Sequence, residues 1–446
     1  MHNGRRQYFI IAFIVLTGSL FFNMLAGIGF AWETKDPQLA EDFAAMLGYK
    51  VKEKVGIVAP EITPGMVIDG ENYLSSPGLK ELLPGSLYRR LDPGSYAPLA
   101  PLKIVKTDHY HLGRGWLEKS VLSAKTAHIA DDGLTLEGYV GGHPFIHPAS
   151  GVELIQWAEN AYLGDTIALR PMRMLLYGHG NKPEREMRQQ VNFLRYMNCT
   201  DWREDIRPNP ENLHYVVSGT FIYPRDISGT AYVRRRYLPS DKPDEFLLYV
   251  CSMRRVRRMS SRDTQDPLFG SDIIWDDYNG FWQKISPTDF PNKYLMLPSK
   301  EMLLPSFVDY DWPQDRALAG FTDWRVDESD GGVYLRFGSW QRRWVHVCEV
   351  ISKDSAYCYS RRVIVNEPET CVQLQGDTYD QAGRLWRSGI RDYNLSRDGV
   401  GIMEDLGEIV DFVNNHRTIV DFKGYRNPQW MGTDYADVRF LSRKAR

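Results

Sequence analysis

Two histidines separated by one residue, His109 and His111, have the spacing that most directly suggests metal chemistry in this chain. On a strand, residues two apart point to the same face, where a zinc ion would need both of them. His128, His143 and His147 are candidates for further ligands. No HExxH motif supplies a catalytic glutamate, so we expect neither a bound metal nor a cofactor. A metal-dependent envelope enzyme that uses His109 and His111 is the alternative hypothesis.

Other common catalytic motifs are absent from the sequence. There is no GxSxG nucleophile motif, and neither standard type of Gly-rich phosphate-binding loop occurs. The formal net charge of −3 does not suggest a nucleic-acid partner. We therefore expect a protein that is not an enzyme and does not bind nucleic acid.

The stretch from Ile273 to Trp282 gathers aromatic residues beside two aspartates. Ordinary core packing is one interpretation, because aromatic residues dominate protein cores. The rim of an apolar ligand cavity is the other. For the second interpretation, the candidate ligand-binding residues are Trp275, Tyr278, Phe281, Trp282, Tyr249 and Met253.

Arginines stand close together at 234–236 and alternate with apolar residues at 254–258. They have two possible partners, carboxylates of the same chain or an external anionic group. Ion pairs with carboxylates such as Asp276, Asp277 and Glu301 are the favoured interpretation, because such pairs are frequent on sheets.

Strand patterns dominate the second half of the chain. Short turns join several of them, and the four residues Asp380–Gly383 predict a hairpin. Strands joined in this way form an antiparallel meander, and a large meander curls because its strands twist. The predicted fold is mainly β (α+β), a curved antiparallel sheet forming a half-barrel with covering helices. The predicted strands are 214–223, 230–238, 245–257, 281–283, 332–338, 343–351, 356–366, 371–379 and 384–393.

Apolar residues at helical spacing predict helices at 152–162, 183–197 and 403–413. A further helix is expected to begin at Asp36-Pro37, with Asp36 as its N-cap. The segment 59–101 is rich in Pro and Gly, and we expect it to wrap irregularly over the surface.

Residues 1–31 have the three parts of a secretory signal peptide: Arg5 and Arg6, an apolar run from Tyr8, and small residues at Gly29 and Ala31. An uncleaved anchor is the alternative, because the run is long enough to span a bilayer. Cleavage predicts a soluble periplasmic protein, whose formal charge becomes −5 when the two arginines leave the total of −3.

The chain has five cysteines. In an oxidising compartment, any disulfide is expected among Cys348, Cys358 and Cys371, which lie on neighbouring predicted strands. The odd count leaves at least one thiol free.

Several ordered motifs together resemble a bacterial periplasmic family called domain of unknown function 1329. They are Gly141-Gly142-His143-Pro144-Phe145 followed by Gly151, Arg234-Arg235-Arg236-Tyr237-Leu238-Pro239, Arg254-Arg255-Val256-Arg257-Arg258 before Gly270-Ser271-Asp272 and Phe281, Arg361-Arg362-Val363-Ile364-Val365, and Tyr379-Asp380-Gln381-Ala382-Gly383-Arg384-Leu385-Trp386. The resemblance runs from about Leu117 to about Phe422. His143 stands where the family is expected to have an apolar residue, and residues 32–101 match no part of it.

This resemblance implies a fold similar to the lipoprotein carriers of the Lol system, with an open curved sheet around a hydrophobic cavity. It also implies an RND/MMPL-type inner-membrane transporter and an outer-membrane-associated protein as partners. The resulting hypothesis is a periplasmic carrier of a lipid or other hydrophobic molecule, with a ligand-free structural adaptor of an exporter as a further alternative. The expected organisation is a signal peptide (1–31), a helix and wrapping segment (32–116), a half-barrel (117–422) and a tail (423–446).

Overall fold

The computed structural model describes residues 37–48, 50–107, 109–110, 112–200, 207–305, 339–395, 401–422, 425–426 and 432–440. The predicted signal peptide, Asp36 and the predicted strand 332–338 lie outside the described residues. Within them, no helix is both long and apolar enough to cross a bilayer.

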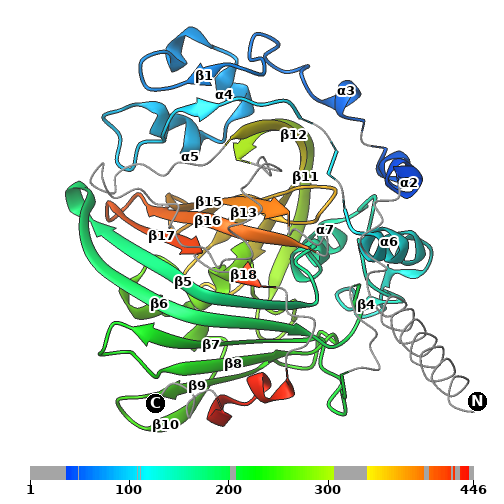
Figure 1. The fold of residues 1–446 in the computed structure, drawn as a ribbon, viewed down its shortest axis with the longest axis vertical. Coiled ribbons are helices and arrows are strands. Elements are labelled where there is room, and N and C mark those ends of the chain that lie inside the picture. Colours follow the sequence, from blue (N-terminus) through cyan, green and yellow to red (C-terminus); the bar gives the residue numbers. More distant parts are fainter. Residues whose placement is uncertain are drawn as a thin grey trace, which may run out of the picture.

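One large antiparallel sheet organises the described part of the chain (Figure 1). Thirteen strands follow one another in the order β10-β9-β8-β7-β6-β5-β17-β16-β15-β14-β13-β12-β11, and β18 pairs with β5. The strands are β5 (Thr166–Gly178), β6 (Lys182–Arg195), β7 (Tyr215–Tyr223), β8 (Ala231–Arg236), β9 (Glu245–Val250), β10 (Arg255–Met259), β11 (Asn292–Pro305), β12 (Trp340–Ser352), β13 (Arg361–Asn366), β14 (Gln373–Tyr379), β15 (Leu385–Leu395), β16 (Ile402–Asp411), β17 (His416–Phe422) and β18 (Tyr425–Arg426).

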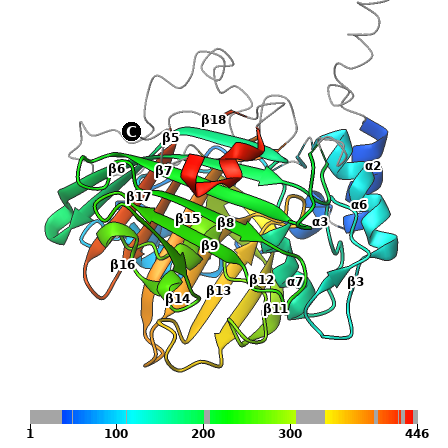
Figure 2. The ribbon, with the colours of Figure 1, turned by 90° about the horizontal axis from the view of Figure 1, so that it is seen from below.

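Two meanders run outward from the β5–β17 pair, one to β10 and the other back to β11. Edge strand β11 also contacts β14 and β15, which are not its hydrogen-bonded neighbours, so this half of the sheet rolls over on itself (Figures 1 and 2). The predicted mainly β fold with a large curved antiparallel sheet is confirmed.

Helices are few and short in the described residues. The α-helices are α2 (Pro37–Leu47), α3 (Val51–Lys54), α4 (Leu79–Leu82), α5 (Gly85–Tyr88), α6 (Arg114–Thr126) and α7 (Gly151–Glu159). The 3₁₀ turns are η1 (Tyr73–Ser75), η2 (Arg89–Leu91), η3 (His179–Asn181), η5 (Asp263–Gln265), η6 (Leu268–Gly270), η7 (Trp275–Gly280) and η8 (Thr433–Ala436). Two small ribbons complete the elements, formed by β1 (Val67–Ile68) with β2 (Leu102–Lys103) and by β3 (His128–Ile129) with β4 (Leu136–Glu137).

Helix α7 lies where the sequence predicts a helix, and its start has a clear local cause. The Ser150 side chain accepts a hydrogen bond from the backbone N–H of Glu153 at 3.2 Å, an N-cap contact. Glycine is required at position 151, because an added Cβ there would lie 2.4 Å from the carbonyl carbon of Tyr294 on β11. The helix therefore packs directly on the sheet.

The helices predicted at 183–197 and 403–413 are wrong, because these residues form β6 and β16. Met187 and Val191 belong to one core cluster and Leu194 to another, as alternation along a strand requires. Leu406 and Ile409 are likewise divided between two clusters. Both faces of this sheet are covered, so apolar residues occur on both faces and imitate a helical period.

Two strand predictions also need correction. The strand predicted at 245–257 is a hairpin, β9 and β10, with a turn at residues 251–254. Residues 281–283 form no strand and follow η7 instead. The hairpin predicted at Asp380–Gly383 is confirmed, since Tyr379 pairs with Leu385 and Gly383 supplies a positive φ of 76°.

The N-terminal segment 59–101 contains only elements of two to four residues and packs against one face of the sheet. Ser86 donates to the Asp377 carboxylate on β14 at 3.0 Å, and Arg90 donates to Glu408 on β16 at 2.5 Å. We call this the outer face. The opposite, inner face is covered by the chain that connects the two edge strands.

All five cysteines are free thiols, so no bridge forms among Cys348, Cys358 and Cys371. The register gives the reason: Ile364 and Met296 stand opposite Cys348 on its two neighbouring strands. Cys358 and Cys371 lie in the loops on either side of β13.

Candidate functional site

Residues 260–291 lead from edge strand β10 to edge strand β11 across the inner face, and we call them the crossing segment. Both halves of the sheet hold its central turn, η7. From one half, Gln189 on β6 donates a hydrogen bond to the Tyr278 hydroxyl at 2.8 Å. From the other half, Arg362 on β13 donates to the Asp277 carboxylate at 2.5 Å. The crossing segment therefore occupies the concave side of the curled sheet.

Trp275 is the most enclosed ring of η7. It is 3% exposed and meets the rings of Tyr232 and Phe246 edge-on, with centroids 4.9 and 5.0 Å away. Tyr278 stacks on its remaining side at 5.8 Å. Trp275 is thus packed by protein on several sides.

Trp282 and Phe281 are also buried, at 5% and 1% exposure. The Trp282 indole N–H donates to the Tyr215 hydroxyl at 3.1 Å, and the Arg234 guanidinium lies 4.4 Å from its ring centroid. Phe281 belongs to the other half of the core, 5.8 Å from the Arg362 guanidinium.

Tyr249 and Met253 lie away from these rings. Tyr249 packs in the cluster that contains Ala436 and Val438, whereas its strand neighbour Leu248 packs in the cluster of Trp275. Tyr249 is therefore on the outer face of the sheet. Met253 is 51% exposed, in the turn between β9 and β10.

A cavity with a volume of about 140 Å³ lies between the crossing segment and strands β5 to β7. Tyr278 and Trp282, two of the six predicted ligand-binding residues, contribute to its wall. Its apolar lining comes mainly from the sheet: Ile167, Leu169, Val191, Phe193, Val217 and Phe422. A ligand role for the six predicted residues stays a prediction.

Two smaller cavities, of about 50 and 30 Å³, continue from the large one along the inner face. The middle cavity shares Met172, Tyr278 and Phe422 with the large one. It shares Asp277 and Arg391 with the smallest one. The three cavities thus form a series that runs from apolar strands to charged ones.

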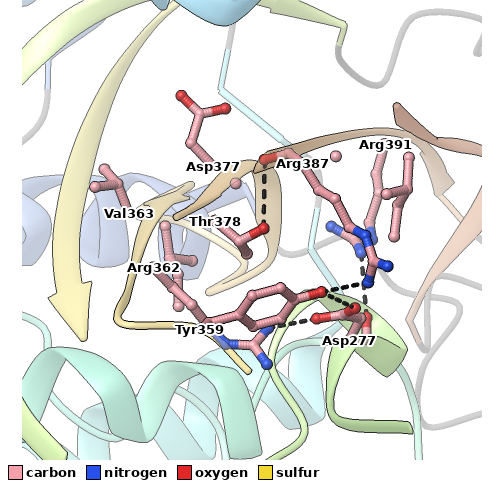
Figure 3. A pocket seen from close by; sticks show the side chains of 13 residues that line it. Asp277, Tyr359, Arg362, Val363, Asp377, Thr378, Arg387 and Arg391 are labelled. Carbon is pink, nitrogen blue, oxygen red and sulfur yellow. Dashed lines mark hydrogen bonds and ion pairs between the residues drawn. The ribbon is translucent and has the colours of Figure 1, made fainter. Parts of the chain in front are cut away.

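Figure 3 shows the charged end, where Arg362, Arg387 and Arg391 converge on Asp277. The Tyr359 hydroxyl lies between them, donating to Asp277 at 3.0 Å and accepting from Arg387 at 2.8 Å. Guanidinium and carboxylate are thus partnered in a region nearly closed to water.

Neighbouring Asp276 is fully buried, and burial raises the pKa of its carboxyl to about 6, although the charges of Arg234 and Arg362 oppose the rise. Its carboxylate accepts hydrogen bonds from Tyr357 at 2.9 Å and from Thr264 at 3.1 Å. Two adjacent carboxylates therefore anchor the crossing segment to the half of the sheet that contains β13: Asp276 through Tyr357, and Asp277 through Arg362.

Much of this site was not singled out from the sequence. Its apolar wall comes from β5 and β6, one unassigned and the other predicted as a helix. Arg387 and Arg391 also received no role, although the spacing Arg387, Gly389, Arg391 along a predicted strand places all three on one face. That spacing was the available signal.

The histidines considered as metal ligands are not grouped in the described residues. His111 lies outside them, and within them no three His, Cys, Asp or Glu side chains are arranged to hold an ion. His109 instead contacts Glu369 at 3.1 Å, and this hydrogen bond raises its pKa. His143 is fully enclosed, its Nε2 donates to the Pro368 carbonyl at 2.8 Å, and burial lowers its pKa to about 3.

His416 anchors the crossing segment through Asp272, and this contact predicts a pH dependence of stability. Its Nδ1 lies 2.6 Å from the Asp272 carboxylate and its Nε2 lies 3.1 Å from Glu184. The hydrogen bond with Asp272 raises the histidine pKa to about 9, from about 6.5 in an unfolded chain. Because the folded-state pKa is the higher one, the stabilisation is complete below pH ~6.5 and is lost as the pH rises through about 9.

We expect the free energy of unfolding to decrease between pH 6.5 and 9.5 by less in a His416→Asn variant than in the wild type. Urea titrations of both proteins at the two pH values measure the difference. Lys284, whose pKa burial lowers to about 8, titrates in both proteins and cancels in the comparison. Equal slopes would show that the Asp272 contact does not set this dependence.

Several solved structures are similar to this chain at low sequence identity. A domain from Vibrio parahaemolyticus described as an outer membrane lipoprotein-sorting protein has 17% identity and a TM-score of 0.44, covering 65% of this chain and 97% of that one. A DUF1329 family protein from Desulfovibrio piger has 15% identity and a TM-score of 0.43, over 65% and 95%. A LolA superfamily protein from Nitrosomonas europaea has 10% identity and a TM-score of 0.38, over 65% and 99%. No curated protein matches the chain.

The family described as "Protein of unknown function (DUF1329)" matches residues 85–442. This match includes the whole large sheet, the crossing segment and the three cavities. The chain therefore belongs to the DUF1329 family.

Proposed function

We propose that this protein is a non-catalytic periplasmic carrier that binds a lipid or other hydrophobic molecule in the concavity of its sheet. The observation that carries the proposal is the apolar cavity of about 140 Å³ between β5 to β7 and the crossing segment. An apolar cavity of about 150 Å³ in another protein stays dry and binds small apolar molecules. An empty cavity of this size costs about 3 kcal/mol, at roughly 24 cal/mol per Å³. An apolar ligand that fills it removes that cost.

Cargo capture in this proposal needs no chemical reaction. Apolar surface leaves water when the cargo enters, which favours binding by about 25 cal/mol per Å². A cargo longer than the cavity series requires the crossing segment to move. Side-chain contacts hold η7 to the sheet, and no described residue of the crossing segment belongs to a strand of the sheet. Its displacement therefore breaks no strand pairing.

The partners belong to the same proposal. The predicted signal peptide directs the protein to the periplasm, and the family resemblance points to exchange with an RND/MMPL-type inner-membrane transporter and an outer-membrane-associated protein. Two of the predicted ligand residues, Tyr278 and Trp282, support the site because they border the cavity.

Filling the cavity with a side chain tests the proposal. We expect delipidated wild-type protein to bind the apolar fluorescent probe N-phenyl-1-naphthylamine, and Val217→Trp to weaken that binding at least ~10-fold because the indole occupies the probe's volume. Probe titration measures the affinity, and circular dichroism checks that the variant is folded. Native mass spectrometry of protein from its own periplasm then identifies the cargo.

Val256→Trp is the matched control, because Val256 is 46% exposed on edge strand β10 and borders none of the three cavities. It should bind the probe like the wild type. A delipidated wild type that takes up no probe, or a folded Val217→Trp variant with unchanged affinity, contradicts the carrier proposal.

A further inference from the structure

Three arginines meet on the inner face at the far end of the cavity series. Arg362 is on β13, and Arg387 and Arg391 are on β15; all three are at most 7% exposed. Arg362 and Arg387 both pair with Thr378 on β14, so they share one row of the sheet. Arg391 follows Arg387 by four residues and lies on the same face. The sheet thus gathers three buried positive charges within one small area.

Two glycines leave open space between these arginines. Gly376 and Gly389 are register partners on β14 and β15, and both line the smallest cavity with the three arginines. A Cβ at Gly376 would have only the Val363 carbonyl oxygen within 4 Å, at 3.6 Å. The smallest cavity therefore exists because glycine at these two positions places no side chain on the inner face.

The arginines are unevenly neutralised. Arg362 makes a short contact of 2.5 Å with Asp277. Arg391 lies 3.4 Å both from the Glu404 carboxylate and from the Asp277 backbone carbonyl, which exceeds the usual length of a hydrogen bond. Arg387 lies 3.5 Å from Asp411, its nearest carboxylate partner. Only one of the three guanidinium groups therefore has a carboxylate at close range.

The close carboxylate comes from the element that must move to admit cargo. Asp277 belongs to η7 of the crossing segment, whereas all three arginines belong to strands. Its two carboxylate oxygens accept from Arg362 and from Tyr359, which itself accepts from Arg387. In this position, the Asp277 carboxylate offers the arginine cluster the same negatively charged oxygen acceptors as an anionic ligand group would offer.

The charged end also connects to the apolar end. Arg391 lines both small cavities, and Glu404 and Tyr278 line both the middle and the large one. From Arg391 the series continues past Tyr278 to the apolar wall of β5 to β7. An amphiphile with an anionic head and a hydrocarbon tail matches this order of polar and apolar walls.

We propose that Arg362, Arg387 and Arg391 form a subsite for the anionic head group, a carboxylate or a phosphate, of an amphiphile whose hydrocarbon tail lies in the large apolar cavity. Asp277 holds this subsite in the empty protein and leaves it with the crossing segment when cargo enters. The assignment rests on the proposed carrier function. A buried arginine left without an anion would be costly, and the incoming head group replaces the anion that leaves.

The test compares two ligands with one tail length and different heads. Palmitate and hexadecan-1-ol are titrated against the delipidated protein by displacement of N-phenyl-1-naphthylamine. Palmitate is expected to bind at least ~10-fold more tightly than the alcohol because only its head is charged. Arg391→Gln should abolish this preference, and Arg391→Lys, which keeps the charge, should restore part of it. Asp277→Asn should increase the preference, because it removes the internal competitor.

Arg361→Gln is the matched control. Arg361 adjoins Arg362 on β13 but borders none of the three cavities, and it pairs with Glu349 at 2.8 Å. The Arg361→Gln variant should prefer palmitate to hexadecan-1-ol as strongly as the wild type does. Sodium acetate and inorganic phosphate, each without a tail, should displace neither palmitate nor the probe.

The outcomes separate the two proposals. If the wild type binds the probe and both ligands with equal affinity, or if Arg391→Gln keeps the full preference, the head-group subsite is wrong and the carrier proposal stands. Displacement of palmitate by acetate or phosphate alone would overturn the amphiphile assignment in favour of a free anion. If the wild type binds no probe and neither ligand, the carrier function itself fails. Melting curves of each variant confirm that the folded protein is compared.

Discussion

Trp275→Ala is expected to lower the free energy of unfolding by about 3–5 kcal/mol, the usual cost of removing a fully packed aromatic side chain. Trp275 is 3% exposed, and the rings of Tyr232, Phe246 and Tyr278 surround it with centroids 4.9 to 5.8 Å away. It borders none of the three cavities of the site. Urea denaturation measures the loss.

Trp282→Ala should cost less than this range, because Trp282 lines the cavity of about 140 Å³ and Trp275 lines none of the three cavities. The same substitution should weaken binding of N-phenyl-1-naphthylamine. Equal stability losses for the two variants, with unchanged probe affinity in Trp282→Ala, would make Trp282 an ordinary core residue. The contrast therefore decides between the two interpretations of the aromatic cluster.

Arg342→Met is expected to cost about 3–5 kcal/mol, because it leaves the buried Glu301 carboxylate without its ionic partner. Arg342 on β12 donates to Glu301 on β11 at 2.7 Å, and Glu301 is 1% exposed. The pair also holds the N-terminal segment. Glu301 accepts from the backbone N–H groups of residues 56–58, at 2.7 to 3.2 Å. Arg342 donates to the carbonyl oxygens of residues 58, 59 and 62.

Hydrogen exchange should therefore become faster at residues 56–58 in Arg342→Met, and urea denaturation measures the loss of stability. In a double variant, Arg342→Met with Glu301→Leu, part of the lost stability should return because no unpaired charge remains buried. Exchange at residues 56–58 should stay fast, since their backbone acceptor is gone. A double variant less stable than the single one would show that the charge is not the source of the cost.

The two halves of the inner face carry different kinds of side chain, and this difference bears on both proposals. Its β5 to β9 half presents Met, Val, Phe and Tyr side chains, which form one core cluster with Trp275 and Trp282. Its β13 to β15 half presents Arg362, Arg387 and Arg391. The crossing segment matches this division, with the rings of Trp275 and Trp282 toward the first half and Asp277 toward the second. A molecule that replaces the segment meets the same two surfaces.

Features of the fold that depend on neighbours along the chain could be predicted from the residues alone. Asp380–Gly383 closes a hairpin because Gly383 adopts a positive φ between two strands of matching pattern. Ser150 begins a helix because its side chain satisfies a backbone N–H three residues later. Alternating strands with short links were sufficient to predict a large curled antiparallel sheet.

The pairing of the strands and the segments that cover them depend on contacts between distant parts of the chain. Residues 183–195 have apolar side chains at helical spacing, yet pairing with β5 and β7 makes them β6, because both faces of that strand find apolar partners. The order of the sheet places β5 beside β17, although β5 begins at Thr166 and β17 begins only at His416.

 No pattern within either strand indicates this contact. The backbone hydrogen bonds that pair two strands do not depend on residue type, and a long stretch of chain separates these two strands.

The candidate functional site also depends on contacts between distant parts of the chain. Gly376 and Gly389 open a cavity only because the register sets them opposite each other, and Arg362 reaches Asp277 only because the crossing segment returns over the inner face. The aromatic residues of that segment could be recognised in the sequence, but their partners could not. Residue types fix what a side chain is able to contact, whereas the curl and register of the sheet fix which side chains come within reach.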